Sequence, residues 1–178
     1  MEDIEAYLDK QIRKVPDFPK KGILFYDITS IMTNPEAFRF CIDKLVERYK
    51  DKDFDGIAAI ESRGFIFAAP LAEKLGKPLV LIRKKGKLPG DTYCASYELE
   101  YGNAEIEVQK SDVHSGEKFL VIDDLIATGG TLNATRELLK MAGANVFEFA
   151  GIIGLPDLNY EKTLQPNVAY TMINYHGA

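Results

Sequence analysis

The apolar positions of this chain follow two rhythms, which predict its strands and its helices. Three short continuous apolar runs, at 56–60, 79–82 and 119–122, are typical of strands buried on both faces. A further strand is expected at 145–153. Between these runs, apolar residues recur every third or fourth position, as on one face of a helix. Buried strands that alternate with helices predict an α/β fold, with a parallel sheet covered on both faces.

Capping residues set the expected helix boundaries. Asn34 is a capping residue and Pro35 suits the first helical position, so a helix is predicted to begin there. Gly76 and Gly143 each follow a helical pattern and are expected to end it. The predicted helices are an amphipathic segment at 2–13, the helix from Pro35 to about Tyr49, and helices at 65–75 and 131–142.

Two segments depart from this rhythm. Residues 93–99 and 104–108 alternate polar and apolar side chains around a turn at 101–103, which predicts an antiparallel hairpin raised above the sheet. The hairpin follows a loop rich in glycine and lysine, near the edge where a parallel sheet binds its ligands, so it is a candidate lid. Residues 15–21 contain two prolines and are expected to form an ordered loop.

Composition and charge narrow the classes of function. A chain of 178 residues fits one domain, and its 46% hydrophobic and 28% charged residues are ordinary for a globular protein. The net charge of −5 argues against nucleic acid as a partner. Cys41 and Cys94 lie too far apart for a zinc ribbon or a disulfide framework, which indicates a reducing, cytoplasmic setting. The acidic N-terminus does not look like a signal peptide, and no apolar run approaches the roughly 20 residues of a membrane helix.

The most informative segment spans residues 120–131. A buried strand ends in the acids Asp123 and Asp124, and a small glycine-rich turn then opens a helix. Unpaired N–H groups at a helix start favour an anion, and glycines allow the backbone to approach it closely. Thr128 and Thr131 can add hydroxyl donors, so the turn fits a phosphomonoester. The turn is neither a Walker A loop nor a dinucleotide fingerprint. Adjacent acids can be plain surface, but at the end of a buried strand they suit ribose hydroxyls and a positively charged ribose ring.

This segment resembles the phosphoribosyl pyrophosphate (PRPP) signature of the type I phosphoribosyltransferases. Its Gly-Gly-Thr ending is similar to the adenine-specific branch of that family. Segments 16–19, 22–27, 61–65, 82–90 and 97–102 are similar to the same branch and occur in the same order. The resemblance covers about residues 12–154. It implies the type I fold over residues 1–178: a central, mostly parallel sheet flanked by helices, a small N-terminal hood at about 1–33, and a flexible loop and projecting lid hairpin at about 83–108.

The resemblance also implies the reaction. Adenine and PRPP would give AMP and pyrophosphate, a step of purine salvage. A phosphoribosyltransferase for another base, such as hypoxanthine/guanine or xanthine, is the main alternative, and a non-catalytic PRPP sensor is another. Mg²⁺ is implied as a cofactor held mainly by phosphate oxygens and water, without direct protein ligands. The family's usual state is a homodimer, so the expected partners are these small molecules and a second copy of the chain.

The sugar-phosphate and pyrophosphate residues can be assigned on the same basis. The 5-phosphate and the ribose are assigned to Asp123, Asp124, Ala127, Thr128, Gly129, Gly130 and Thr131. Pyrophosphate is assigned to Arg63, Arg83 and Lys87, whereas Lys84 and Lys85 are equally well explained as surface side chains. Members of the fold often have a cis peptide in the loop that contains Arg63.

The base-binding and proton-transfer residues come from two other segments. Phe25 is expected to stack on adenine, and the backbone of Leu24 and Tyr26 to contact the edge of the base. Tyr26 stands where mammalian members have arginine. Glu100 is the expected proton acceptor. Glu98 shares its face of the predicted strand, so spacing does not choose between the two glutamates, and the resemblance selects Glu100.

Overall fold

The helices and strands alternate along most of the chain, as the apolar pattern predicts. The computed structural model describes residues 3–99 and 102–177. The helices are α1 (Ile4–Gln11), α2 (Thr29–Met32), α3 (Pro35–Tyr49), α4 (Gly64–Leu75), α5 (Gly130–Met141) and α6 (Tyr160–Leu164), with two 3₁₀ turns, η1 (Lys110–Asp112) and η2 (Pro156–Leu158). The strands are β1 (Arg13–Pro16), β2 (Leu24–Asp27), β3 (Gly56–Ile60), β4 (Leu79–Lys84), β5 (Thr92–Leu99), β6 (Gly102–Gln109), β7 (Lys118–Ile122), β8 (Leu125–Ile126), β9 (Asn145–Gly154) and β10 (Ala169–Asn174).

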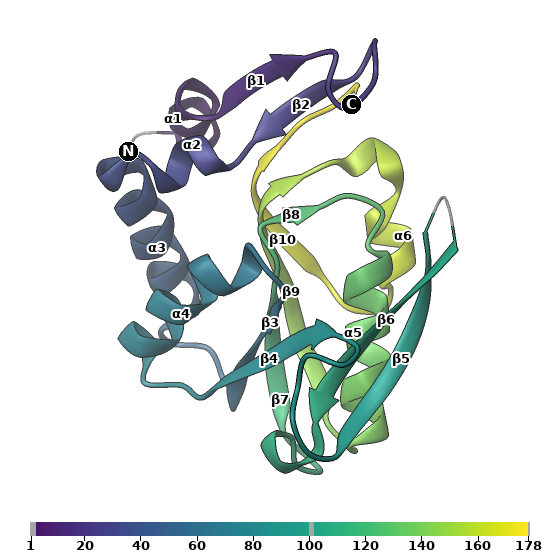
Figure 1. Cartoon of the computed structure of the whole chain (residues 1–178). Helices are drawn as coiled ribbons and strands as arrows, with labels where there is room; N and C mark the ends of the chain where they lie inside the picture. The colour runs from purple at the N-terminus through teal and green to yellow at the C-terminus, as the bar shows by residue number, and fades with distance from the viewer. Residues whose placement is uncertain (1–2, 100–101, 178) are drawn as a thin grey trace.

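The main sheet is mostly parallel and has the order β10-β9-β7-β3-β4-β6-β5, with the short β8 paired to β9. β10, β9, β7, β3 and β4 are parallel neighbours, and β4-β6 and β6-β5 are antiparallel pairs. Helices α3 and α4 cover one face and α5 and α6 the other (Figure 1). This is the α/β architecture predicted from the sequence.

Two apolar cores lie on the two faces of the sheet. Alternate residues of β3 divide between them: Ile57 and Ala59 pack with α3 and α4, whereas Ala58 and Ile60 pack with α5. All five residues of β3 are buried. This double burial explains why the central strands are continuous apolar runs rather than alternating ones.

The predicted helix boundaries hold to within a few residues. The Asn34 side chain accepts hydrogen bonds from the N–H groups of Glu36 and Ala37, and Pro35 begins α3. Gly76 caps α4 with φ +62°, in the left-handed region that favours glycine. The first helix is shorter than predicted and ends at Gln11, because the chain then enters β1.

The predicted hairpin is present as β5 and β6, but its base is part of the main sheet. Arg83 and Lys84 at the end of β4 pair antiparallel with Glu107 and Ile106 of β6. The two strands then pass across α5, and their far end projects beyond it (Figure 1). Ala95, Ile106 and Val108 are buried in the same core as α5. The hairpin is therefore joined to the sheet where Ile106 and Glu107 of β6 pair with β4, and it is not raised above the sheet there.

The N-terminal hood is a small two-stranded sheet. β1 pairs antiparallel with β2, with Val15 opposite Phe25, so the prediction of an irregular loop from residue 15 is wrong for Val15 and Pro16. Tyr26 of β2 stacks on Tyr175 just beyond β10, with ring centroids 3.7 Å apart, which ties the hood to the C-terminal end of the chain. Within residues 3–99 and 102–177, no helix is long and apolar enough to cross a bilayer.

Candidate active site

Three polar loops meet at one edge of the sheet because β7, β3 and β4 are parallel neighbours. Their carboxyl ends lead into the loops that begin at residues 61, 85 and 123, close to the ligand-binding turns predicted at 61–64, 83–91 and 124–131. A pocket of about 270 Å³ opens between them. It is lined by Glu61, Ser62, Arg63, Lys84, Asp123, Asp124 and Leu125. The structure thus brings together residues that lie far apart in the sequence.

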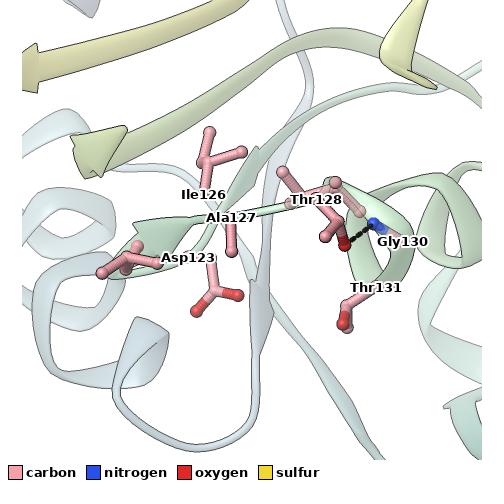
Figure 2. A pocket seen from close by; sticks show the side chains of 9 residues that line it. Asp123, Ile126, Ala127, Thr128, Gly130 and Thr131 are labelled. Atoms are coloured by element: carbon pink, nitrogen blue, oxygen red, sulfur yellow. Dashed lines mark hydrogen bonds between the residues drawn. The ribbon is translucent and has the colours of Figure 1, made fainter. Parts of the chain in front are cut away.

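A second pocket, of about 90 Å³, is formed by the turn at residues 127–131, which we call the phosphate turn. Figure 2 shows Asp123 on one side of this pocket and Thr128, Gly130 and Thr131 on the other. The Thr128 hydroxyl oxygen accepts a hydrogen bond from the Gly130 N–H at 3.4 Å. The first bond of the α5 ladder runs from the Asn133 N–H to the Gly129 carbonyl, so the preceding N–H groups have no intrahelical acceptor. The turn therefore presents backbone donors and hydroxyls to an anion.

Two contacts fix the shape of the phosphate turn. Gly129 has φ +80°, which favours glycine, and a Cβ there would crowd α6, at 3.2 Å from Leu164 Cγ and 3.3 Å from Tyr160 Cβ. On the other side, a Cβ on Gly130 would lie 3.8 Å from a ring carbon of Tyr97 of β5. Tyr97, which the sequence did not single out, thus packs the hairpin against the start of α5.

The two predicted ribose carboxylates differ in their surroundings. Asp123 is half-buried, lines both pockets and accepts a hydrogen bond from the Asp124 N–H at 2.8 Å through Oδ1. Burial, together with the neighbouring Asp124 carboxylate, raises the pKa of Asp123 well above its ordinary value. Asp124 is only 3% exposed and forms an ion pair. Asp124 is therefore paired with a cation, whereas Asp123 faces both pockets.

Arg63 supplies that cation. Its Nε donates to Asp124 Oδ2 at 2.5 Å, and this hydrogen bond raises the pKa of the guanidinium. α4 starts very close to β7, since a Cβ on Gly64 would lie 2.9 Å from the Ile122 carbonyl oxygen. The Glu61–Ser62 peptide in the same loop is cis, as the resemblance implied. The predicted pyrophosphate arginine thus stands directly beside the predicted ribose carboxylates.

The remaining predicted pyrophosphate cations are arranged differently from expectation. Arg83 donates to both carboxylate oxygens of Glu61, at 3.2 and 3.3 Å, and to the Lys87 carbonyl oxygen at 3.3 Å, so its charge is already matched by a carboxylate. Neither Arg83 nor Lys87 is among the residues that line the 270 Å³ pocket, whereas Lys84 is. Lys84 was equally well explained as a surface side chain, because a single lysine in the basic run at residues 83–87 carries no signal of its own.

The predicted base residues lie on β2 in the hood. Leu24 is 37% exposed, and the half-buried ring of Phe25 meets Phe18 edge to face at 5.0 Å. The Tyr26 side chain is buried against Tyr175, so only its backbone remains for a ligand. Asp27, at the end of β2, pairs with Arg13 at 3.1 Å, and its charge also contributes to raising the pKa of Arg63. The base-binding roles of Leu24, Phe25 and Tyr26 stay predictions.

Glu100, the predicted proton acceptor, lies outside the described residues, and so does Tyr101 of the predicted turn. The strands on either side are described up to the register pairs Glu98 with Asn103 and Leu99 with Gly102. Three lining residues, Glu61, Ser62 and Leu125, had no assigned role from the sequence. Glu61 and Ser62 stand in the segment that resembles the family, and Leu125 follows the paired acids, so their position in a motif was the available signal.

Comparisons with known proteins show the family and the fold. The phosphoribosyl transferase domain family matches residues 27–171. An adenine phosphoribosyltransferase from Treponema denticola is 64% identical over 171 residues, which cover 96% of this chain and 90% of that protein. The crystal structure of adenine phosphoribosyltransferase from Thermoanaerobacter pseudethanolicus superposes with a TM-score of 0.90 at 40% identity, covering 96% of this chain and 99% of the other. The enzyme from Trypanosoma brucei, in complex with AMP, pyrophosphate and ribose-5-phosphate, has a TM-score of 0.87 at 30% identity and covers 98% and 81%.

Proposed function

This chain belongs to the phosphoribosyl transferase family, and from that premise we propose that it joins adenine to the ribose 5-phosphate of PRPP, releasing pyrophosphate and forming AMP. The observation that carries the proposal is the meeting of three kinds of group at one sheet edge. These are the phosphate turn at 127–131, the Asp123–Asp124 pair, and the pocket with Arg63 and Lys84. Their order along the edge matches the three parts of PRPP: its 5-phosphate, its ribose and its pyrophosphate.

The chemistry of the transfer follows from this order. The bond between ribose C1 and a pyrophosphate oxygen breaks, and its electron pair leaves with pyrophosphate. Positive charge then develops on the ribose ring, where the Asp123 carboxylate would stabilise it. Pyrophosphate leaves with several negative charges, which Arg63 and Lys84 would balance. Lys87 stays a predicted pyrophosphate ligand, while the contacts of Arg83 support a role in holding the loop.

Mg²⁺ is proposed to enter with PRPP. Within the described residues, no group of three or more His, Cys, Asp or Glu side chains is arranged to hold a metal ion. The donor set fits an ion held chiefly by phosphate oxygens and water, because Asp123 faces the pocket beside Glu61 and could accept from metal-bound water. When bound, Mg²⁺ would supply charge neutralisation of the pyrophosphate group.

Adenine is proposed to bind between the hood and this edge. One imidazole nitrogen of the base forms the new bond to ribose C1, while the other loses its proton, for which Glu100 is the predicted acceptor. Phe25 would stack on the ring, and a backbone carbonyl of β2 would accept from the 6-amino group, which a 6-keto purine lacks. A site built to accept a hydrogen bond from the 6-amino group would reject a 6-keto purine strongly.

The position of Tyr26 leads to a test of this arrangement. Because its ring is buried on Tyr175, Tyr26→Phe should keep the stacking and leave the β2 backbone in place. We expect the KM for adenine and the preference for adenine over hypoxanthine to stay within about twofold of the native values, as for a change that removes no ligand contact. Steady-state kinetics with both bases measure this. A large loss of base preference would mean that the Tyr26 side chain, and not its backbone, contacts the base.

The assembly and the location are further parts of the proposal. The family's usual state supports a homodimer, and the two free cysteines support a reducing, cytoplasmic setting. Light scattering coupled to size exclusion is expected to give twice the mass of one chain. A monomeric mass would remove the homodimer from the proposal.

The choice of base is tested directly by competition. Purified protein, PRPP and Mg²⁺ are supplied with adenine, hypoxanthine, guanine, xanthine or orotate, and each nucleotide product is quantified. AMP formation with the highest kcat/KM is the expected result. Preferred use of hypoxanthine or guanine would favour the alternative base specificity, and absence of any nucleotide product would favour a PRPP sensor.

A further inference from the structure

One buried carboxylate of the hairpin has no part in the chemistry described so far. Glu105 and Glu107 lie on the same face of β6, two residues apart. Glu105 is at the surface, where it pairs with Lys85 at 3.0 Å. Glu107 is only 4% exposed, although a glutamate on the polar face of a strand is expected at the surface. A buried carboxylate needs hydrogen bonds that offset its loss of water.

Glu107 finds those hydrogen bonds in the loop that follows β4. Its Oε1 accepts from the N–H groups of Lys87 at 2.9 Å and Leu88 at 2.8 Å. Its Oε2 accepts from the Thr92 hydroxyl, at the start of β5, at 3.3 Å. Burial opposes the charge, but the backbone N–H groups and the hydroxyl outweigh it and lower the pKa of Glu107. The carboxylate thus connects both sides of the loop at residues 85–91.

The loop has a flexible backbone, and β6 supplies further hydrogen bonds to it: Gln109 Nε2 donates to the Pro89 carbonyl oxygen at 3.0 Å, and the Lys85 N–H donates to the Glu105 carbonyl oxygen at 3.1 Å. Gly86 and Gly90 both have positive φ, +83° and +73°, and glycine adds conformational freedom to the chain. The carbonyl oxygen of Lys87 is held by Arg83, whose guanidinium in turn binds Glu61 in the 270 Å³ pocket. Glu61 also accepts from the Lys84 N–H at 2.9 Å. Glu107 therefore stands at one end of a chain of contacts that ends at the pyrophosphate pocket.

We propose that Glu107 is a positioning residue: its buried carboxylate holds the loop at residues 85–91 in the form that keeps Lys84, which directly precedes the loop, in the pyrophosphate pocket. The proposal rests on the function proposed above. Glu107 does not line the pocket, so it acts through the loop. Its negative charge alone would weaken the binding of an anion nearby, so a positioning role and a purely electrostatic one predict opposite effects of removing it.

The test compares two probes that do not require turnover. Binding of inorganic pyrophosphate with MgCl₂, and of ribose 5-phosphate, is measured by calorimetry on the full chain. Glu107→Asp keeps the charge but shortens the side chain, and Glu107→Ala removes it. Both are expected to weaken pyrophosphate binding by about 10-fold, the size of one or two lost charge-assisted hydrogen bonds, and to change ribose 5-phosphate binding by less than about twofold. Glu107→Gln keeps the length and an oxygen acceptor, and is expected to stay within about threefold of the native affinity.

Glu105→Ala is the matched control, because it removes a surface carboxylate from the same face of the same strand. It is expected to leave pyrophosphate binding unchanged or slightly tighter. Tighter or unchanged pyrophosphate binding in folded Glu107→Asp, a 10-fold loss in Glu107→Gln, or an equal loss for ribose 5-phosphate would each overturn the proposal. If Glu107→Ala does not fold, the pyrophosphate affinities of Glu107→Asp and Glu107→Gln decide whether the proposal holds. Failure of the native protein to make AMP would count against the proposed function alone, since the binding comparison does not depend on it.

Discussion

Asparagine in place of Asp123 is expected to slow AMP formation by about 10²–10³-fold, the typical effect of removing one preorganised group that stabilises transition-state charge. Asp123 faces both pockets, next to the phosphate turn, where the positive charge of the ribose ring would develop. An amide has the same shape but carries no charge to balance that ring. Initial rates of AMP formation at saturating adenine and PRPP measure the effect.

The same substitution is expected to stabilise the fold. Since the pKa of Asp123 is raised in the folded protein, the free energy of unfolding falls as pH rises from the ordinary aspartate pKa to the raised one, because the unfolded chain ionises more readily than the half-buried carboxylate. The amide of the Asp123→Asn variant carries no such charge, so its advantage over the native protein should be absent at low pH and appear as pH rises. A gain of about 1 kcal/mol would raise Tm by about 2–4 °C in a chain of this size.

Asp43→Asn is the control for both effects, because it removes an exposed carboxylate of α3 that pairs with Lys74 far from the site. Neither its rate nor its Tm should differ appreciably from the native values. Full activity of Asp123→Asn would remove Asp123 from the reaction. A lower Tm of Asp123→Asn at neutral pH would show that the charge of Asp123 does not destabilise the fold.

Glutamine in place of Arg63 is expected to lower kcat/KM for PRPP by about 10²-fold or more and also to weaken the fold. The guanidinium is the cation beside both predicted ribose carboxylates, and glutamine cannot balance the leaving pyrophosphate. Asp124 is buried and would lose its ion-pair partner, at a cost of about 1–3 kcal/mol. This is less than for a fully buried pair, because the Arg63 side chain is 52% exposed and water screens it.

A double-mutant cycle with Asp124→Asn separates the two effects. If Arg63 and Asp124 act as a unit in the fold, the double variant should be no less stable than Arg63→Gln alone, since the amide at position 124 no longer needs a cation. The loss of kcat/KM for PRPP should persist in the double variant, because the guanidinium is still missing. Additive losses of Tm would show that the ion pair does not couple the two side chains. An unchanged kcat/KM in Arg63→Gln would remove Arg63 from pyrophosphate binding.

Local patterns were sufficient to predict the elements of the sheet core. The buried strands β3, β7 and β9 and the helices α3, α4 and α5 each carry a continuous apolar run, a helical rhythm or a capping residue. The short strands β1, β2 and β8 and the helices α2 and α6 were not predicted, because two to five residues are too few to establish a period. The six-residue strand β10 was missed as well. The pairing of β4 with β6 was also missed, since a contact between strands leaves no mark on the apolar pattern of either.

Some parts of the site could also be predicted from local sequence, and other parts could not. The phosphate turn and its two acids were predicted because they are contiguous in sequence and sit where a parallel sheet binds ligands. Which basic side chain reaches the pocket depends on partners that are distant in sequence. Arg83 pairs with Glu61, whereas Lys84 lines the pocket. No local sequence rule predicts which of these two basic side chains reaches the pocket. The burial of Glu107 is likewise visible only once β6 is placed beside the loop.

The most direct test of the account is a crystal structure of this chain with adenine, ribose 5-phosphate and pyrophosphate bound together with Mg²⁺. The predicted result has the 5-phosphate on the backbone N–H groups of residues 127–131, the ribose hydroxyls on Asp123, and pyrophosphate between Arg63 and Lys84. Adenine would stack on Phe25, with the Glu100 carboxylate within hydrogen-bond distance of its imidazole ring. A 5-phosphate bound away from the turn at 127–131, or a base bound away from β2, would contradict it.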